Sequence, residues 1–354
     1  MRKIAIFQSE LGVGGIQKSL VNLLRAIDYD RVQVDLYLSG RESFWNVDFP
    51  EKLNIRYLDK TPRIYSFIPF DAAKRCLKYR FPEGEEYDLA VDFNSYQCSC
   101  AVGALTVPAK CRVMWIHNDV RIKLQNEWKY RVLWFFFKGK FKHYDGFVPV
   151  SNALWEPFSS MSGCSGARHR VIQNVINVQE IRDKMCDKPE GLTLEEGCMN
   201  FVALGRLCHQ KGYDIMLNAF SAASGARDDL RLYIIGDGPD EAALKAQARQ
   251  LGIAEKVHFL GKKSNPYCYM KEMDAFISTS RYEGQPLNIM EALAVGLPLY
   301  CTKNLESYTE GLKGCGDIVQ ALIAAEKQPK KPDDLIEYNK KILDSIYDLA
   351  EGNI

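Results

Sequence analysis

Short apolar runs bounded by turn residues recur along the chain, and segments with helical spacing separate most of them. This alternation predicts parallel β-strands joined by α-helices. One series of runs ends near residue 151 and a second starts after Asn200, which predicts an α/β protein with two doubly wound, Rossmann-like domains. The expected strands are residues 3–7, 32–38, 54–58, 87–93, 111–116 and 144–151, followed by 201–205, 230–236, 256–261, 274–280 and 297–302.

The length of 354 residues suits two domains rather than one. We expect an N-terminal domain over residues 1–182 and a C-terminal domain over residues 201–332. The segment between them, 183–200, is charged and has no clear period, so it is the expected linker. The tail, 333–354, predicts a helix because four apolar side chains fall on one helical face: Leu335, Tyr338, Ile342 and Ile346.

Composition favours a cytoplasmic protein. The chain is 47% hydrophobic and 26% charged, which is typical of globular proteins. No apolar run approaches the roughly 18 residues of a membrane-spanning helix, and the basic start lacks the long apolar segment of a signal peptide. Eleven cysteines without a CxxC pair fit a reducing compartment.

Charge is distributed unevenly along the chain. Residues 1–182 contain 26 Lys plus Arg against 19 Asp plus Glu, a net +7, whereas residues 183–354 contain 20 against 26, a net −6. The asymmetry suggests different partners for the two halves, with simple solvation as the alternative. The sequence shows no nucleic-acid recognition motif, so we do not expect nucleic acid as a partner.

In doubly wound folds, ligands bind outside the carboxyl ends of the strands, so the loops after the strands are the places to look for chemistry. The first such loop contains Gly12, Gly14 and Gly15 ahead of a helix. Glycines there let backbone N–H groups approach a phosphate or sugar at the positive helix end. The dinucleotide-binding spacing is absent, because Gln17 stands where its third glycine would be. A generic glycine turn remains the alternative.

Two cations follow the first strand of the second series. Arg206 lies in the exit loop and Lys211 opens the next helix. A cation at a helix N-terminus is unfavourable for the helix dipole unless an anion lies beside it. A diphosphate would supply that anion, and ordinary solvated surface charges are the alternative interpretation.

Two carboxylates lie eight residues apart after the strand expected at 274–280. Glu283 is in the exit loop, Pro286 suits the first helical turn and Gly296 suits the helix end, which places Glu291 inside the helix. Glu291 can then accept both hydroxyls of a ribose, while Glu283 can reach the hydroxyls of a sugar carried by the diphosphate. The alternative for Glu291 is a solvated surface charge.

The spacing of Glu283 and Glu291 resembles the E-x7-E motif of retaining glycosyltransferases of the GT-B fold. With "GGIQKSL", "GRLCHQKG", "IIGDGP" and "VHFLG", the chain is similar over nearly its whole length to glycosyltransferase family 4. The resemblance implies two domains facing a cleft, a nucleotide-diphospho-sugar donor and a C-terminal helix that crosses back to the first domain. The chain departs from the family at Gln285, where relatives often have an aromatic residue.

The resemblance also implies the site residues. Arg206 and Lys211 match the diphosphate-binding pair, Glu291 the ribose ligand and Glu283 the residue that holds the donor sugar. His117 matches the cleft histidine near the reacting carbon, although a lone histidine after a strand is otherwise more often structural. The other expected donor-binding positions are Gly14, Gly15, Leu260, Gly261, Lys262, Gly284, Gln285, Pro286, Leu287 and Asn288.

Departure of the nucleotide diphosphate develops negative charge, which Arg206, Lys211 and the helix N-terminus would stabilise. We therefore expect no metal and no cofactor, and we interpret the D-x-D at 28–30 as a solvated turn. No side chain is assigned as the base. Family frequency favours a UDP-sugar, and the expected acceptor is a glycan or a lipid-diphosphate-linked glycan of a cell-surface polysaccharide.

Residues 121–143 combine seven Lys or Arg with seven aromatic residues and one Glu. This segment suits an anionic membrane surface, which would make the protein peripheral at the inner face of the cell membrane. The alternative is a helix that packs its aromatics into the core. Two other functional classes stay open at this point: a sugar epimerase of the same fold, and a catalytically silent binding subunit of a glycan-assembly complex.

Overall fold

The computed structural model describes the chain except residues 13, 42–48, 60, 127 and 310. It divides into two compact units. The first contains residues 1–175 and 336–354, and the second contains residues 176–335. Each unit has its own parallel sheet, and all eleven expected strands form.

The first unit is built on a six-stranded parallel sheet of order β3-β2-β1-β4-β5-β6. Its strands are short and largely buried, as expected of a sheet covered by helices on both faces. Helix α3 packs closely on β1, because a side chain at Gly103 would come within 2.5 Å of the Phe7 ring. The strands are β1 (Arg2–Gln8), β2 (Val32–Leu38), β3 (Asn54–Tyr57), β4 (Tyr87–Asp92), β5 (Ala109–Ile116) and β6 (Gly146–Pro149).

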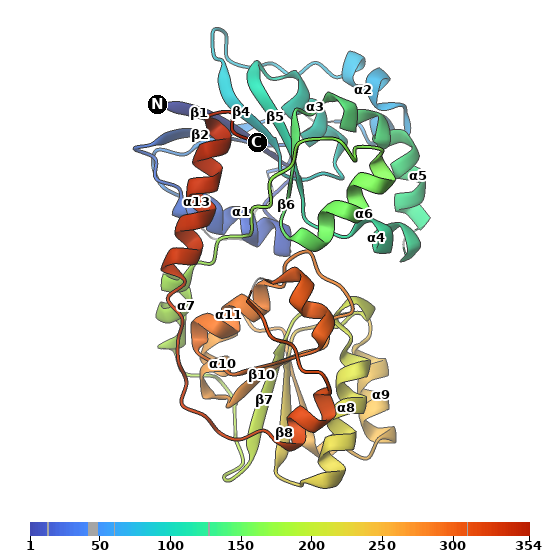
Figure 1. The fold of residues 1–354 in the computed structure, drawn as a ribbon, viewed down its shortest axis with the longest axis vertical. Helices are drawn as coiled ribbons and strands as arrows, with labels where there is room; N and C mark the ends of the chain where they lie inside the picture. Colours follow the sequence, from blue (N-terminus) through green and yellow to red (C-terminus); the bar gives the residue numbers. More distant parts are fainter. Residues whose placement is uncertain (13, 42–48, 60, 127, 310) are drawn as a thin grey trace. The chain divides into compact units, whose positions relative to one another are not determined.

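Helices of the first unit lie on both sides of this sheet (Figure 1). They are α1 (Gly15–Ala26), α2 (Phe70–Cys76), α3 (Cys98–Thr106), α4 (Val120–Asn126), α5 (Trp128–Phe137), α6 (Asn152–Ser162) and α13 (Ile336–Ala350), with the 3₁₀ helices η1 (Arg63–Phe67) and η2 (Lys138–His143). Figure 1 shows α13 along one side of the unit and α5 and α6 on the opposite side.

Helix α13 confirms the predicted C-terminal helix that returns to the first domain. The Tyr347 hydroxyl accepts a hydrogen bond from the backbone N–H of Asp28 at 2.8 Å. Arg170 forms an ion pair with Asp348 at 2.8 Å. Ile342 and Ile346 are buried, so the predicted apolar face is the face that packs.

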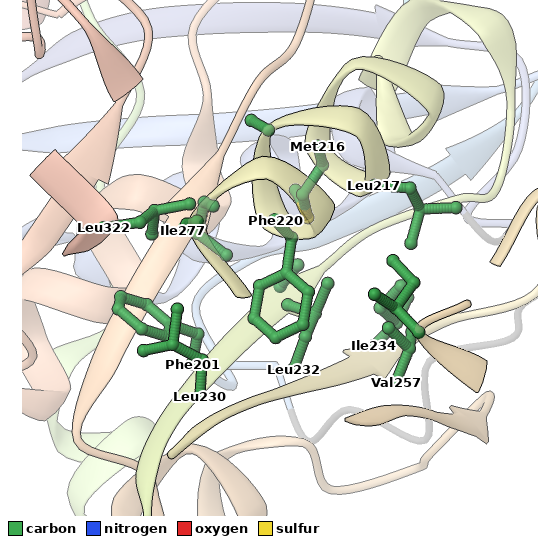
Figure 2. Close-up of a cluster of buried hydrophobic side chains, with 14 of the residues drawn as sticks. Phe201, Met216, Leu217, Phe220, Leu230, Leu232, Ile234, Val257, Ile277 and Leu322 are labelled. Atoms are coloured by element: carbon green, nitrogen blue, oxygen red, sulfur yellow. The ribbon is translucent and has the colours of Figure 1, made fainter. Parts of the chain in front are cut away.

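The second unit has a five-stranded parallel sheet of order β11-β10-β7-β8-β9. Figure 2 shows its core, where Met216, Leu217 and Phe220 of α8 pack on side chains of the strands. Its strands are β7 (Met199–Leu204), β8 (Leu230–Ile235), β9 (Val257–Gly261), β10 (Ala275–Ser278) and β11 (Leu299–Cys301). Its helices are α7 (Val178–Met185), α8 (Tyr213–Ala226), α9 (Glu241–Gln250), α10 (Tyr267–Glu272), α11 (Leu287–Val295) and α12 (Ile318–Ile323), with η3 (His209–Lys211), η4 (Ala254–Lys256) and η5 (Lys303–Tyr308).

The chain passes from the first unit to the second between residues 175 and 176, upstream of the expected linker at 183–200. Hydrogen bonds explain this position: the Asn22 side chain of α1 donates to the Val175 carbonyl at 3.1 Å. Helix α7, which follows, packs on α10 and α11 and so belongs to the second unit. The expected linker therefore lies inside the second unit.

Candidate active site

Backbone hydrogen bonds join the carboxyl ends of β7, β8 and β9, and the close approach at Gly236 requires a glycine. Gly205 donates to the Ile235 carbonyl at 3.0 Å, and Gly236 donates to the Gly261 carbonyl at 2.9 Å. Gly236 has a φ of 144°, and a Cβ there would lie 1.9 Å from the Gly205 oxygen. The glycines thus hold the loop that carries Arg206 against its neighbours. Arg206 itself is exposed.

Lys211 and Glu283, two of the predicted site residues, form an ion pair. Lys211 Nζ lies 2.6 Å from Glu283 Oε1, and the Gln210 side chain donates to Glu283 Oε2 at 3.3 Å. The Lys211 side chain is 19% exposed to solvent, whereas the Glu283 side chain is 6% exposed. The anion that the helix dipole requires beside Lys211 is therefore a carboxylate of the protein itself.

Arg281 fixes the position of this pair, and the sequence did not single it out. Its guanidinium binds both Asp214 oxygens, at 2.7 and 2.5 Å, and donates to the His209 carbonyl at 2.8 Å. The same hydrogen bonds lower the pKa of Asp214. Because these contacts join the loop after β10 to the start of α8, they hold Glu283 near Lys211. The sequence did offer one signal for Arg281, because it is a cation that directly follows the strand expected at 274–280.

Helix α11 begins after Pro286 and ends at Gly296, which has the left-handed φ of 91°. Glu291 lies inside this helix and is 4% exposed, so the alternative of a solvated surface charge is wrong. The Tyr267 hydroxyl of α10 donates to Glu291 Oε1 at 3.3 Å. Tyr267 is a second residue that the sequence did not reveal, because only the fold brings α10 beside α11.

The other donor-binding positions expected in the second unit also lie at the carboxyl edge of its sheet. Asn288 donates its side-chain amide to the Leu204 carbonyl at the end of β7, at 2.7 Å. The remaining positions lie before and within the first turn of α11 or at the end of β9: Gly284, Gln285, Pro286 and Leu287, and Leu260, Gly261 and Lys262. Gln285 is 7% exposed, and Lys262 is exposed.

Gly14, Gly15 and His117 belong to the first unit, at the carboxyl edge of its sheet. Gly14 precedes α1 and Gly15 is its first residue. His117 follows β5 and is 6% exposed, with its ring centroid 4.6 Å from that of Phe93. Burial lowers the pKa of His117 to about 3, against a hydrogen bond to the Phe93 backbone, so the imidazole is neutral at pH 7. Within the described part of the chain, its Nε2 atom has no hydrogen-bond partner.

Segment 121–143 forms part of α4, then α5 and η2; Glu127 within it lies outside the described residues. Lys140 is not a surface cation: it is 1% exposed, lies 3.2 Å from Asp92 Oδ2 and donates to the Ser95 carbonyl at 2.5 Å. Phe137 and Phe141 are also buried. One side of the segment thus packs its aromatic residues into the core, as the alternative interpretation expected. The exposed Trp128 and Phe135 lie on the other side.

No helix among the residues that the structure describes is long and apolar enough to cross a membrane. No three His, Cys, Asp or Glu side chains among them gather as a metal site would require. Metal independence stays a prediction.

Comparison with known proteins finds similarity to glycosyltransferases. Residues 188–342 match the family model of glycosyl transferases group 1. The chain is 24% identical to an uncharacterized glycosyltransferase of Haemophilus influenzae, over 84% of this chain and 80% of that protein. It is 23% identical to an uncharacterized glycosyltransferase of Methanocaldococcus jannaschii, over 54% of this chain. The matched part spans about half, 47%, of the latter protein.

One further relative and one solved structure bear on substrates. The chain is 28% identical, over 45% of its length and 41% of the relative, to an N-acetylgalactosaminyltransferase of Campylobacter jejuni that is named for a diphospho-undecaprenol-linked acceptor. The structure of Anabaena HepE in complex with UDP-glucose has a TM-score of 0.63 at 17% identity, covering 98% of this chain and all of that one. The chain therefore has the GT-B fold. The curated proteins that it resembles are glycosyltransferases, and the comparisons favour neither of the two alternative classes.

Proposed function

We propose that the chain is a retaining glycosyltransferase of family 4 that moves a hexosyl or N-acetylhexosaminyl unit from a nucleotide-diphospho-sugar to a glycan or lipid-diphosphate-linked glycan. The observation that carries this proposal is the ion pair of Lys211 with Glu283, at 2.6 Å. Glu283 precedes the buried Glu291 by eight residues, and all three residues lie within the segment that matches the group 1 family model. HepE, which binds UDP and UDP-glucose, supports a UDP-sugar as donor. The Campylobacter relative is named for a diphospho-undecaprenol-linked acceptor, which supports a lipid-diphosphate-linked glycan as the acceptor here.

The contacts suggest a division of roles. Glu291, held by Tyr267, accepts the ribose hydroxyls, and Glu283 accepts hydroxyls of the donor sugar. We propose that the Lys211 ammonium, which pairs with Glu283, also binds the diphosphate, so that one group holds the carboxylate and the leaving group together. Because Lys211 retains 19% exposure, exchange of partners does not require the core to open.

Bond cleavage leaves the negative charge on the nucleoside diphosphate, where Arg206, Lys211 and the N-terminus of α11 stabilise it. His117, neutral at pH 7, can exchange a hydrogen bond with a sugar hydroxyl through Nε2. With fixed cations at the leaving group, we propose that no metal ion is needed. Turnover that is lost in excess EDTA and restored by Mg²⁺ or Mn²⁺ would contradict this part of the proposal.

The test separates the two carboxylates. Both are buried, so Glu→Gln substitutions are used because they keep side-chain volume. Glu291→Gln should weaken UDP and UDP-sugar binding alike, by about ten- to hundred-fold, because both ligands carry the ribose. Glu283→Gln should weaken the UDP-sugar and slow transfer but leave UDP affinity nearly unchanged. Isothermal titration calorimetry measures both, and equal loss of UDP affinity in the two folded variants would overturn the assignment.

A further inference from the structure

The first unit exposes apolar side chains on two neighbouring elements. Helix η1 packs against α5, and Figure 1 shows α2 and α5 on the same side of the unit. Five large apolar side chains are exposed there: Ile64 (67%), Phe67 (53%), Trp128 (65%), Val132 (41%) and Phe135 (68%). We call these five residues, with Arg131 and Lys138, the η1–α5 face. Exposed apolar residues grouped in this way mark an interaction site more often than scattered ones do.

The helical spacing of α5 explains why this face is not simply core. Trp128, Arg131, Val132 and Phe135 recur every three or four residues and share one side of the helix. The opposite side is already covered, because Tyr130, Leu133, Trp134 and Phe137 line an apolar pocket inside the unit. Helix α5 therefore has apolar side chains on two sides, and only one of these sides packs against the rest of the unit.

Charge indicates what covers the other side. Residues 62–81 and 120–143, which contain η1, α2, α4, α5 and η2, together have twelve Lys or Arg and two Asp or Glu. Arg75, Lys78, Arg131 and Lys138 are exposed, and Lys138 Nζ lies 5.5 Å from the Phe135 ring centroid. Cations beside aromatic rings are typical of side chains at a lipid headgroup boundary. A second copy of the same basic face would repel it.

We propose that the η1–α5 face docks on an anionic phospholipid bilayer, with Ile64, Phe67, Trp128 and Phe135 inserted among the headgroups and the neighbouring cations against the lipid phosphates. The surface extends the sequence prediction for residues 121–143 to η1 and leaves out the buried Lys140. It lies wholly in the first unit and stands independently of the donor site proposed above.

The test is flotation of the purified full chain with vesicles of phosphatidylglycerol and phosphatidylcholine, and with phosphatidylcholine alone. The wild type should float with the anionic vesicles only, and less as salt rises. Arg131→Glu/Lys138→Glu should weaken binding by about fivefold or more per cation, and Phe67→Ser/Phe135→Ser should weaken it at every salt concentration. The controls are Lys340→Glu/Lys341→Glu, two exposed cations of α13, and Met161→Ser, an exposed apolar residue of α6; both should bind as the wild type does.

Tryptophan emission gives a second readout. Vesicles should shift the emission to shorter wavelength, and Trp128→Phe should bind but lose most of this shift. Failure of the folded wild type to float, or equal flotation of the face variants and their controls, would overturn the proposal. So would a wild-type dimer that Phe67→Ser/Phe135→Ser converts to a monomer, because the face would then be a protein interface. Turnover of a soluble acceptor by the non-floating variants would leave the transfer reaction standing, so the two proposals can fail separately.

Discussion

The two units each place a lysine beside a carboxylate near the carboxyl edge of a sheet, but the two pairs differ in access. Lys140 and Asp92 in the first unit are 1% and 0% exposed, and the Tyr144 hydroxyl donates to Asp92 Oδ2 at 2.6 Å. Lys211 in the second unit keeps 19% exposure at its ion pair with Glu283. A sealed pair cannot exchange partners without unfolding, whereas a half-open pair can. We therefore expect the same chemistry to serve stability in the first unit and, under the proposed function, ligand binding in the second.

The largest expected effect comes from breaking the sealed pair. Lys140→Met leaves Asp92 charged and buried without its cation, which should lower the free energy of unfolding by about 3–5 kcal/mol. All five tryptophans lie before residue 176, so tryptophan fluorescence during urea unfolding reports on the first unit. The matched control is Lys138→Met, which removes an exposed cation two positions away. If the two variants unfold at the same urea concentration, the pair in the first unit contributes no more than a surface charge.

The half-open pair should respond in the opposite way. Lys211→Met removes a charged hydrogen bond to the proposed diphosphate and should weaken UDP binding by about ten- to hundred-fold. It should leave the tryptophan-detected unfolding unchanged, because Lys211 is in the second unit. Calorimetry measures the binding, and Lys245→Met, which breaks a partly exposed ion pair with Glu241, is the control. Unchanged UDP affinity in Lys211→Met would show that the Lys211–Glu283 pair does not take part in binding the diphosphate.

His117 lets pH sharpen the comparison within the first unit. Its pKa falls from an ordinary value of 6.5 to about 3 on folding, so between these values the unfolded chain binds more protons. The stability that His117 contributes is present above about pH 6.5 and is lost as the pH falls toward 3. Between about pH 7 and pH 5 the loss should be about 2 kcal/mol.

The control for the pH effect is His117→Gln, which does not titrate. Its tryptophan-detected free energy of unfolding should fall by about 2 kcal/mol less over the same interval than that of the wild type. Equal slopes in the two proteins would show that His117 is not buried in its neutral form.

Local pattern was enough to predict the strands, the ends of α11 at Pro286 and Gly296, and the helix α13, because periodicity and turn residues are properties of neighbouring positions. The return of α13 to the first domain was implied only by the family resemblance. Local pattern could not predict which charged side chains form ion pairs with one another. Lys211 and Glu283 are 72 residues apart, and the sequence gives each only as a charge near a strand end. Lys140 stands in a basic run where every cation looks solvated, and only the fold shows that it meets Asp92 from β4.

The candidate site also contains residues that the sequence could reveal and residues that only the fold reveals. Charged residues after strands could be found, because doubly wound folds collect ligands at that edge. The residues that hold them, Arg281 and Tyr267, could not be assigned, since their contacts depend on how separate loops and helices pack. A tyrosine in a short apolar helix is most often a core residue, and Tyr267 is indeed 4% exposed.

Tyr267 therefore provides the smallest and most specific test of the ribose assignment. Its hydroxyl donates to Glu291 Oε1, so Tyr267→Phe keeps the ring in the core but removes one hydrogen bond that positions the carboxylate. The loss should be about 1 kcal/mol, or about fivefold in UDP affinity by calorimetry. Tyr269→Phe is the control, because this neighbour in α10 donates to the Glu190 carbonyl at 2.9 Å instead. Since Tyr267 acts through Glu291, Tyr267→Phe should have no further effect in a Glu291→Gln background, and additive losses would mean that the hydroxyl contacts UDP independently.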